Sequence, residues 1–444
     1  MVQEIKTKEE VFETIEKRAV KSIGLWFTDI LGRLKSVAIS VSELEAAFDE
    51  GMGFDGSSIK GFARIDESDM LAKPDPTTFR IVPWRPKADV VARMFCDILQ
   101  PDGTPYEGDP RYILKRNLEH LKEDSYTFYV GPELEYFYFR GNKNPELLDE
   151  GGYFDLMTLD AGSDLRRDAV LTLEAMGIDV EASHHEVAPS QHEIDLRYKD
   201  ALTMADQVMT YRIVIKEIAQ QQGCYASFMP KPIFGVNGSG MHVHQSLFKG
   251  DRNAFFDQNE EYQLSEHAKG YIAGLLRHAP EITSITNQWI NSYKRLVPDY
   301  EAPVYITWAR RNRSTLVRVP MYKPGKEKAT RVEYRSADPA CNPYLAFSVM
   351  LAAGLAGMKG KYELPPSTEK DVYLMNGAER AKEGIMSLPG SLIEAIGLTE
   401  KSELVREALG NHTFNNFITS KKVEWDKYRV NVSEWELKEY LPVL

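Results

Sequence analysis

The sequence has little cysteine and no long uncharged run. Its three cysteines, Cys96, Cys224 and Cys341, lie far apart and form no CxxC pair. This argues against a disulfide framework and against a cysteine-based zinc site. The longest apolar run, at 344–358, is shorter than the roughly 20 residues that cross a bilayer, and the opening MVQEIKTKEE lacks the apolar core of a secretory signal. We therefore predict a buried helix at 344–358 and a protein of the reducing cytoplasm.

Positive charge and nucleotide-binding fingerprints are also scarce. The formal net charge is −12, which argues against a protein that follows nucleic-acid phosphates or an anionic membrane surface. There is no GxxxxGK[ST] motif, so a P-loop is excluded. A GxGxxG pattern occurs at 51–56, but it follows a predicted helix instead of a strand, the reverse of a dinucleotide site. Any nucleotide site must therefore use neither a P-loop nor the glycine motif of a dinucleotide-binding fold.

The turn-rich segment QPDGTPYEGDP, 100–110, divides the chain. Before it, capping boxes at Thr7 and Ser42 predict two helices, with a hairpin between them. After it, helices alternate with strands that carry polar residues at two-residue spacing, and no repeat period is found. The length and the 43% apolar content fit roughly two or three domains. We place one domain at 1–103 and the other at 104–444.

The segment GPELEYFYF, 131–139, puts two carboxylates into an otherwise apolar strand. Because side chains alternate along a strand, Glu133 and Glu135 share a face with two phenylalanines, while Leu134 and two tyrosines take the other face. Apolar residues on both faces are typical of a strand that is covered on both sides. Two buried like charges cannot both stay ionised without a cation. The alternative is an ordinary solvent-facing pair.

Other predicted strands carry a similar polar face. Residues 330–336 place Arg331, Glu333 and Arg335 on one face, and residues 191–198 do the same with two acids and an arginine. Either strand alone fits a surface ion-pair ladder. Taken together, five glutamates with one or two histidines favour Mg²⁺ or Mn²⁺ over zinc. The candidate histidines are the two beside Glu186 in SHHEVAPSQHE and the pair His242 and His244, and the glutamates of this pool are Glu133, Glu135, Glu186, Glu193 and Glu333.

Arginines are concentrated in the stretch between residues 295 and 318, at Arg295, Arg310, Arg311, Arg313 and Arg318. A guanidinium group grips phosphate or carboxylate with two hydrogen bonds, so this concentration in an acidic protein indicates an anionic substrate. A solvated basic face is the alternative for Arg310 and Arg311. The glycines of 234–240 fit either a ligand-binding turn or a plain hairpin turn. The residues thus predict a two-metal, arginine-lined site for phosphoryl transfer, without naming the acceptor.

Eight segments, in this order, resemble type I glutamine synthetase over essentially the whole chain: FDGSSIKGF, GPELEYF, GGYFDL, SHHEVAPSQHE, FMPKPIFGVNGSGMH, NSYKRLVPDYEAP, RNRS and RVEYRSADPACNPYLA. The resemblance implies an α+β fold, with a small β-grasp-like N-terminal domain and a larger catalytic domain whose curved antiparallel sheet is flanked by helices. It also implies a homo-dodecamer of two hexameric rings with active sites between subunits. The expected reaction is ATP-dependent ligation of ammonium to the γ-carboxylate of L-glutamate through γ-glutamyl phosphate.

The resemblance also implies roles for individual residues. One Mg²⁺ or Mn²⁺ ion is expected on Glu135, Glu186 and Glu193, and the other on Glu133, His242 and Glu333. ATP is expected near Glu181, Ser246, Arg313, Arg318 and Arg331. Glutamate is expected near Asn237, Gly238, Arg295, Glu301 and Arg335. Ammonium is expected near Asp55 of the adjacent subunit, Ser58, Tyr153 and Glu186. Catalytic roles fall to Asp55 as proton acceptor, Glu301 as a flap that excludes water, and Arg313.

The chain departs from the family pattern at a few positions. Asp299 stands in the flap where the family usually has glycine, and Gln288 stands where it usually has proline. Tyr373 lies near the position that one branch adenylylates, but the Leu-Pro-Pro that follows there is missing, so we expect the short, non-adenylylated branch. Arg64 resembles the arginine linked to feedback inhibition by glutamine, and we predict such inhibition.

Two rival functions stay open at this level. One is a γ-glutamyl ligase of the same fold that uses an amine in place of ammonium. The other is a catalytically silent structural or regulatory homologue. A contact with a transcription regulator is a further partner that the short branch allows.

Overall fold

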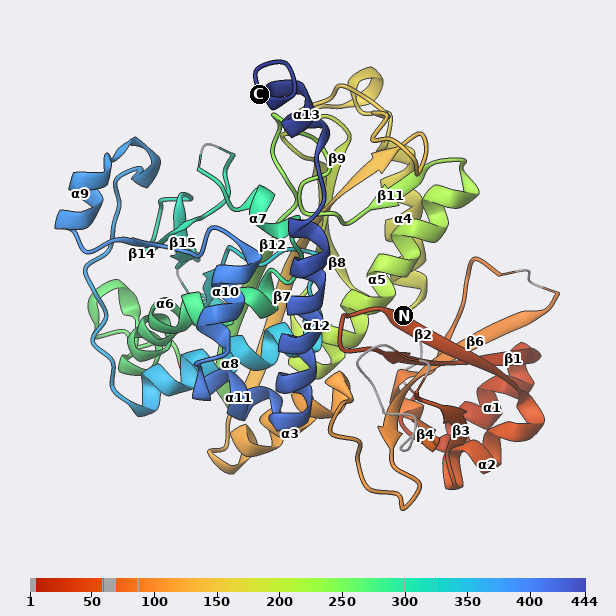
Figure 1. Ribbon diagram of the computed structural model, residues 1–444. Coiled ribbons are helices and arrows are strands. Elements are labelled where there is room, and N and C mark those ends of the chain that lie inside the picture. Colours follow the sequence, from red (N-terminus) through yellow and green to blue (C-terminus); the bar gives the residue numbers. More distant parts are fainter. Residues whose placement is uncertain (1–4, 58, 60–68, 86–87, 299, 324) are drawn as a thin grey trace.

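The computed structural model describes residues 5–57, 59, 69–85, 88–298, 300–323 and 325–444 (Figure 1). Ser58, Arg64 and Asp299 lie outside these ranges, so the predictions made for them stay predictions. In the part of the chain that is described, no helix is both long and apolar enough to cross a membrane.

Within the described residues, the N-terminal domain is a six-stranded mixed sheet of order β2-β1-β6-β4-β3, with β5 paired to β6. Strand β1 is parallel to β6 and antiparallel to β2, as in a β-grasp. Helices α1 and α2 contribute Val11, Ile15 and Leu44 to the core of this domain. The elements are α1 (Lys8–Arg18), β1 (Val20–Thr28), β2 (Leu34–Ser40), α2 (Leu44–Asp49), β3 (Met52–Asp55), β4 (Asp69–Pro74), β5 (Arg80–Ile81) and β6 (Val90–Leu99).

One of the two predicted capping boxes is confirmed. The Thr7 hydroxyl accepts from the Glu10 amide, and the Glu10 carboxylate accepts from the Thr7 amide, at the start of α1. The prediction for Ser42 was wrong. A 3-10 turn at Val41–Glu43 precedes α2, and Ser42 lies inside it, with its hydroxyl 2.7 Å from the Ser40 hydroxyl. The Ser42 hydroxyl is therefore hydrogen-bonded to Ser40, two residues earlier, and caps no helical amide.

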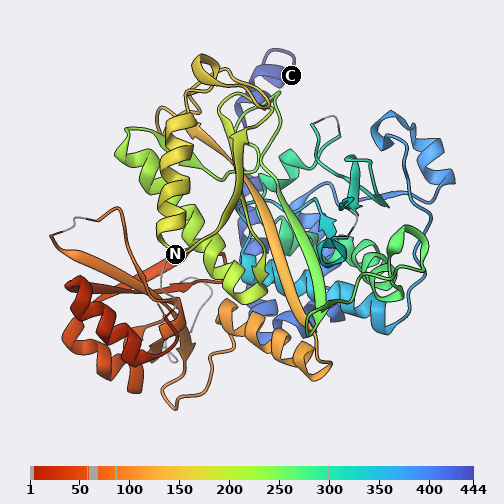
Figure 2. The same cartoon turned by 180° about the vertical axis from the view of Figure 1, so that it is seen from behind.

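The larger domain is built on a curled sheet of order β17-β14-β15-β16-β12-β7-β9-β8. Its central strands are antiparallel, and Figure 2 shows the long strands β7 and β12 side by side from behind. The pair β14 and β15 is parallel, which departs from the expected all-antiparallel order. The strands of the main path are β7 (Thr127–Phe139), β8 (Val180–His185), β9 (Gln191–Leu196), β12 (Met241–Lys249), β14 (Tyr305–Ala309), β15 (Thr315–Arg318), β16 (Val332–Tyr334) and β17 (Met386–Ser387). Short side strands are β10 (Lys199–Asp200), β11 (Tyr225–Ser227) and β13 (Arg252–Asn253).

Helices cover one face of this sheet and leave the other face for the site. Leu134, Tyr136 and Tyr138 of β7 are buried in the main core, and the Tyr211 hydroxyl of α5 donates to the Leu134 carbonyl at 3.1 Å. The predicted apolar helix is confirmed as α8, which packs against α6. The helices up to this point are α3 (Pro110–Glu123), α4 (Ser163–Ala175), α5 (Ala201–Gln221), α6 (Glu266–Thr286), α7 (Ser292–Arg295) and α8 (Pro343–Lys359). The C-terminal part adds α9 (Gly377–Lys382), α10 (Leu392–Thr399), α11 (Glu403–Leu409), α12 (Asn411–Arg429) and α13 (Glu434–Tyr440).

A buried ion-pair network joins the two domains. The Arg111 guanidinium, at the start of α3, lies 2.7 Å from Asp75 and 2.5 Å from Asp97 of the N-terminal domain. It also lies 3.0 Å from Asp206 of α5, whose carboxylate accepts a further hydrogen bond from Tyr344 at 2.6 Å. These contacts hold the N-terminal sheet against the catalytic domain.

Candidate active site

A cavity of about 780 Å³, here called the carboxylate cavity, opens over the polar face of the catalytic sheet. Strand alternation places acids there because every second residue of β7, β9 and β16 points to this face. The predicted strand pattern of 131–139 is confirmed, since Phe137 and Phe139 are also covered, in a small cluster with Ala188. The acids that line the cavity include Glu133, Glu135, Glu186, Glu193 and Asp195.

Strand register brings one metal-type cluster together at β7, β12 and β16. Glu133 is directly opposite His242, and Glu333 is directly opposite His244. Oxygen or nitrogen atoms of Glu133, His244 and Glu333 all lie within 4.8 Å of one another. His242 lies beside them, with Nδ1 3.4 Å from Glu133 and 3.7 Å from Glu333. His244 is thus a second nitrogen donor at this cluster. The two-residue spacing in MHVH marked it as a candidate, whereas the resemblance gave only His242 as the histidine ligand.

Two arginines flank Glu333. Both Arg318 and Arg335 donate to its carboxylate. Burial alone would raise the pKa of Glu333, but Arg335 and the histidines beside it lower this pKa to about 2. The pKa of Glu133 is lowered in the same way. His244 and His242 favour its ionised form by more than burial disfavours it, so its pKa lies well below the usual range. Both carboxylates are therefore ionised.

A second cluster combines Glu186, Glu193 and His184, whose ligand atoms also lie within 4.8 Å of one another. His184 Nδ1 is 3.5 Å from Glu186, and His184 Nε2 is 3.5 Å from Glu193. Glu135 lies beside this cluster, where its carboxylate accepts from the Gly240 amide at 2.9 Å. His184 was not predicted, although it falls in the segment SHHEVAPSQHE that was singled out.

Carboxylates also face carboxylates across β7 and β9. Glu135 is directly opposite Glu193, and Glu133 is directly opposite Asp195. Burial, together with Glu186, raises the pKa of Glu135 to about 8, and burial with Glu133 raises the pKa of Asp195 to about 7. Like charges directly opposite one another destabilise a sheet unless a cation neutralises them. Oxygen-rich clusters with few nitrogen donors and no sulfur suit hard divalent ions.

The other end of the cavity is basic and is lined by arginines and by residues 300–302. Arg295 is buried and donates to the carbonyls of Ser336 at 2.7 Å and Arg335 at 3.4 Å. A Cβ on Gly238 would lie 2.2 Å from the Pro230 carbonyl oxygen, so only glycine fits there. The Asn237 amide donates to Glu301 at 2.9 Å.

The backbone at Glu301 is strained. Its φ is +57°, in the left-handed region that non-glycine residues adopt rarely. Such a conformation costs energy and persists when surrounding contacts favour it. The contact with Asn237 described above is one of these, and residues 300–302 line the cavity.

Not every predicted site residue lines the carboxylate cavity. Tyr153, Arg313 and Arg318 line it, and so does Arg311, for which a solvated basic face was the alternative. The predicted ATP residues Glu181, Ser246 and Arg331 do not line it, although Arg331 Nε approaches His244 Nδ1 at 3.2 Å. Asp55 lies at the exposed end of β3, where its carboxylate accepts from Ser57, and it does not line the cavity of its own chain.

Gln288, one of the departures from the family pattern, and Tyr373 both donate hydrogen bonds to backbone carbonyls. The Gln288 side chain donates to the carbonyl of Leu31 at 2.8 Å and to that of Ala340 at 3.2 Å, so the amide ties the catalytic domain to the β1–β2 turn. The Tyr373 hydroxyl donates to the Ala302 carbonyl at 2.7 Å. The fold and the site together define a two-domain, metal-dependent enzyme that acts on anionic substrates.

The chain belongs to the glutamine synthetase family. The family model described as glutamine synthetase, beta-Grasp domain, matches residues 19–101, and the model described as glutamine synthetase, catalytic domain, matches residues 107–440. The chain is 52% identical over 442 residues to a glutamine synthetase of Methanosarcina mazei, which covers 99% of this chain and 98% of that protein. It is 53% identical over 440 residues to one of Mycolicibacterium smegmatis, covering 98% and 99%.

Solved structures agree with this assignment. The cryo-EM structure of Plasmodium falciparum glutamine synthetase has a TM-score of 0.88 at 25% identity and covers 98% of both chains. A structure described as a GmaS/ADP complex has a TM-score of 0.88 at 28% identity, covering 97% of this chain and 99% of that one. The protein is therefore an ATP-dependent, metal-using ligase that forms glutamine from glutamate and ammonium.

Proposed function

We propose that the reaction passes through γ-glutamyl phosphate in the carboxylate cavity. A carboxylate is a poor electrophile, so the γ-carboxylate of glutamate first accepts the γ-phosphoryl group of ATP, and ammonia then displaces phosphate. The observation that carries the proposal is the pairing of carboxylates across β7 and β9, in a cavity that arginines also line. The carboxylates suit divalent cations, and the arginines suit phosphate and carboxylate groups.

Two divalent ions, Mg²⁺ or Mn²⁺, fit the two clusters. We propose Glu135, Glu186 and Glu193 for one ion, and Glu133, His242 and Glu333 for the other, with His184 and His244 as additional donors. The raised pKa of Glu135 supports this set, because an acid that resists ionisation when alone becomes a good ligand beside a cation. When bound, the ions neutralise charge on the transferring phosphoryl group.

Glutamate is proposed to bind at the basic end of the cavity, through Asn237, Gly238, Arg295, Glu301 and Arg335. Arg295 is fixed by hydrogen bonds to three backbone carbonyls, so its guanidinium group loses little freedom when it meets a carboxylate. Because Gly238 has no side chain, the backbone there can approach a ligand closely. Glu301 is proposed to act as a flap that keeps water from the acyl phosphate.

ATP is proposed to bind near Glu181, Ser246, Arg313, Arg318 and Arg331. Among these, Arg313 and Arg318 line the cavity, and Arg313 is proposed to stabilise charge on the phosphoryl group in the transition state. Arg318 already contacts Glu333, so it sits between a proposed metal ligand and the space for phosphate.

Ammonium is proposed to bind at Glu186 and Tyr153, with Ser58, and with Asp55 supplied by an adjacent subunit. The exposure of Asp55, away from its own cavity, supports active sites shared between subunits in a homo-dodecamer of two hexameric rings. The Ser57 hydroxyl and amide lower the pKa of Asp55, which keeps this carboxylate ionised to attract a cation. The same carboxylate is proposed to take a proton from ammonium.

Four further predictions remain proposals. We place the domain boundary between residues 103 and 104, in the segment between β6 and α3. We propose direct inhibition by glutamine through Arg64, which predicts that an Arg64→Ala enzyme is less sensitive to glutamine. We also propose a cytoplasmic location, supported by three free cysteines. A contact with a transcription regulator is the fourth.

The test is phosphate release by the purified protein with ATP, glutamate and Mg²⁺, with and without ammonium, together with detection of glutamine. Ammonium-dependent phosphate release that matches glutamine formation supports the proposal. Release stimulated only by methylamine or another amine would instead assign a γ-glutamyl-amine ligase. No turnover with Mg²⁺ or Mn²⁺ in an assembled oligomer would indicate a catalytically silent homologue.

A further inference from the structure

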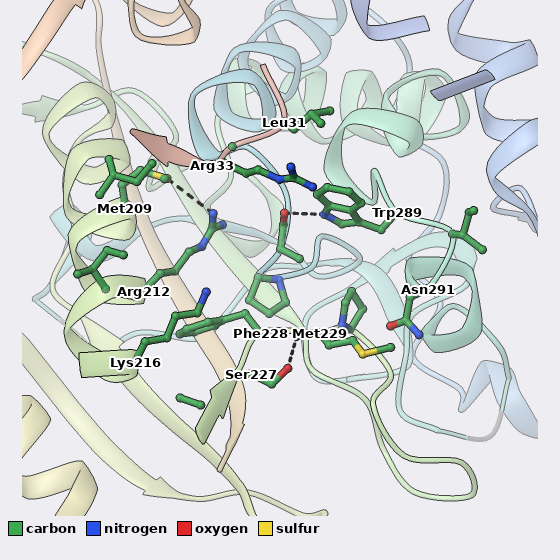
Figure 3. Close-up of a pocket in the computed structure, with 18 of the residues that line it drawn as sticks. Leu31, Arg33, Met209, Arg212, Lys216, Ser227, Phe228, Met229, Trp289 and Asn291 are labelled. Atoms are coloured by element: carbon green, nitrogen blue, oxygen red, sulfur yellow. Dashed lines mark hydrogen bonds between the residues drawn. The ribbon is translucent and has the colours of Figure 1, made fainter. Parts of the chain in front are cut away.

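A second cavity, of about 770 Å³ and here called the basic cavity, lies between the N-terminal domain and the catalytic domain (Figure 3). Its walls come from the β1–β2 turn, from helix α5, from the segment 225–230, from the segment 289–294 and from helix α12. The two cavities share no lining residue. The basic cavity is therefore a separate site.

Positive charge dominates its lining. Four cationic side chains line it, and none of them forms an ion pair with a described residue: Arg33, Arg212, Lys216 and Lys294. Glu424 is the one carboxylate among the described lining residues, and it is already paired with Lys421 at 3.0 Å. In a protein with a formal net charge of −12, such a local excess of cations attracts anions.

Arg212 is the buried member of this set, with 7% of its surface exposed. Its Nη2 donates to the Cys341 carbonyl at 2.7 Å, and its Nη1 makes only a weak contact with Met209 Sδ at 3.7 Å. Its Nε is buried without a partner among the described residues. A buried cation without a carboxylate is costly, and an anion in the adjacent cavity would remove this cost.

Lys216 lies one helical turn after Arg212, and Figure 3 shows both side chains extending from α5 toward the same space. A carboxylate or phosphate group placed there could accept from both, in charge-assisted hydrogen bonds. Among the described residues, no acid accepts a hydrogen bond from Arg212 or Lys216.

The rest of the lining is apolar and aromatic. Phe228 lies under Lys216, with the ammonium 5.7 Å from the ring centroid. The Trp289 indole nitrogen already donates to the Ala340 carbonyl at 2.9 Å, and the Arg33 and Lys421 cations lie 5.9 Å and 4.0 Å from its ring centroid. The volume falls within the roughly 300–1,000 Å³ of small-molecule sites. The lining thus suits a flat apolar body.

We propose that the basic cavity binds a small organic anion, with a carboxylate or phosphate group on a flat apolar body. Arg212 and Lys216 bind the anionic group, and Phe228 and Trp289 contact the body. This site is distinct from the glutamate and ATP sites proposed above, and its test does not use the ligase reaction.

The test is calorimetric titration of the full-length protein with 1-naphthoate, 1-naphthyl phosphate and the neutral 1-naphthamide. We expect at least one of the anions to bind about tenfold or more tightly than the amide, as charge-assisted hydrogen bonds require. The comparison of the two anions shows which group the site prefers. Equal affinity for the amide and both anions, or no binding of either anion, would overturn the proposal.

Variants locate the binding. Because Arg212 is buried and bonded to the Cys341 carbonyl, its substitution could perturb folding, so the exposed Lys216 serves instead. Lys216→Gln should weaken binding of the preferred anion about tenfold, and Lys401→Gln, an exposed lysine outside the cavity, should leave it unchanged. If Lys216→Gln has no effect while Arg335→Gln abolishes binding, the anion occupies the carboxylate cavity and the proposal is wrong.

Discussion

Glu135 of β7 and Glu193 of β9 are directly opposite each other in the catalytic sheet, and burial raises the pKa of both carboxyl groups. The neighbouring carboxylates raise the two pKa values further, since each ionised group opposes the ionisation of the next. An arrangement that is unfavourable for the protein alone is favourable once a divalent cation binds. The metal affinity of the site therefore depends on the pairing register of β7 and β9, which places the two carboxyl groups opposite each other.

Replacing Glu193 should have opposite effects with and without metal. Glu193→Gln replaces a carboxyl group whose ionisation burial and the neighbouring carboxylates oppose, so the variant without metal should be as stable as the unmodified protein or more stable at neutral pH. Its stabilisation by Mn²⁺ should shrink, because a ligand that binds the folded state more weakly stabilises it less. Thermal unfolding with chelator and with Mn²⁺ measures both. Glu174→Gln, an exposed acid on α4, is the control and should change neither value. A full Mn²⁺ response in Glu193→Gln would remove Glu193 from the ligand set.

The domain junction should depend on Arg111. Arg111→Met leaves Asp206 buried without its cation, and breaking such a pair costs about 3–5 kcal/mol. Arg167→Met is the control, since Arg167 pairs with Asp164 on the surface, where an ion pair contributes about 0–1 kcal/mol. The two variants are compared by thermal and urea denaturation. Equal destabilisation would mean that the buried network does not hold the domains together.

Glycine at 357 should be required by helix packing. A Cβ there would lie 2.0 Å from the Gly270 carbonyl oxygen, where α6 and α8 meet. Gly357→Ala should therefore destabilise by about 1–3 kcal/mol or more through overpacking. Gly397→Ala is the opposite case, because its Cβ meets nothing within 4 Å inside α10, and it should stabilise by up to about 1 kcal/mol. Melting temperatures that shift the same way in both variants would contradict this account.

Removing the Glu301 side chain should uncouple the reaction. Glu301→Ala loses the contact with Asn237, so water should reach the acyl phosphate and phosphate release should exceed glutamine formation. Glu301→Gln keeps an oxygen that accepts from Asn237, so its ratio of phosphate to glutamine should stay near that of the unmodified enzyme. The ratio is measured by parallel assays of the two products. A ratio unchanged in Glu301→Ala would argue against a shielding role.

Much of the site could be predicted because alternation along a strand is a local property. The positions of Glu133 and Glu135 on one face of β7 follow from their two-residue spacing alone, and so does the burial of Tyr136 on the other face. The same spacing marks His244, but it cannot say which histidine meets Glu333. That choice depends on how β12 pairs with β16.

Local patterns failed where competing contacts decide the outcome. Ser42 has the sequence of a helix cap, yet a 3-10 turn begins first and its hydroxyl contacts Ser40. The sequence alone does not show which of the neighbouring His184 and His185 faces the metal-type cluster. The fold brings His184 to Glu193, whereas His185 Nε2 lies 3.0 Å from Asp149.

The sequence by itself determined the elements of this protein, the polar stripe on its strands and its family, because periodicity and motifs are written in neighbouring residues. Tertiary structure alone decided that Glu135 meets Glu193, that Arg111 joins two domains, and that unpaired Arg212 borders a second cavity. These relationships connect residues far apart in the chain. They depend on strand register and on the packing of helices against sheets, which no local segment specifies.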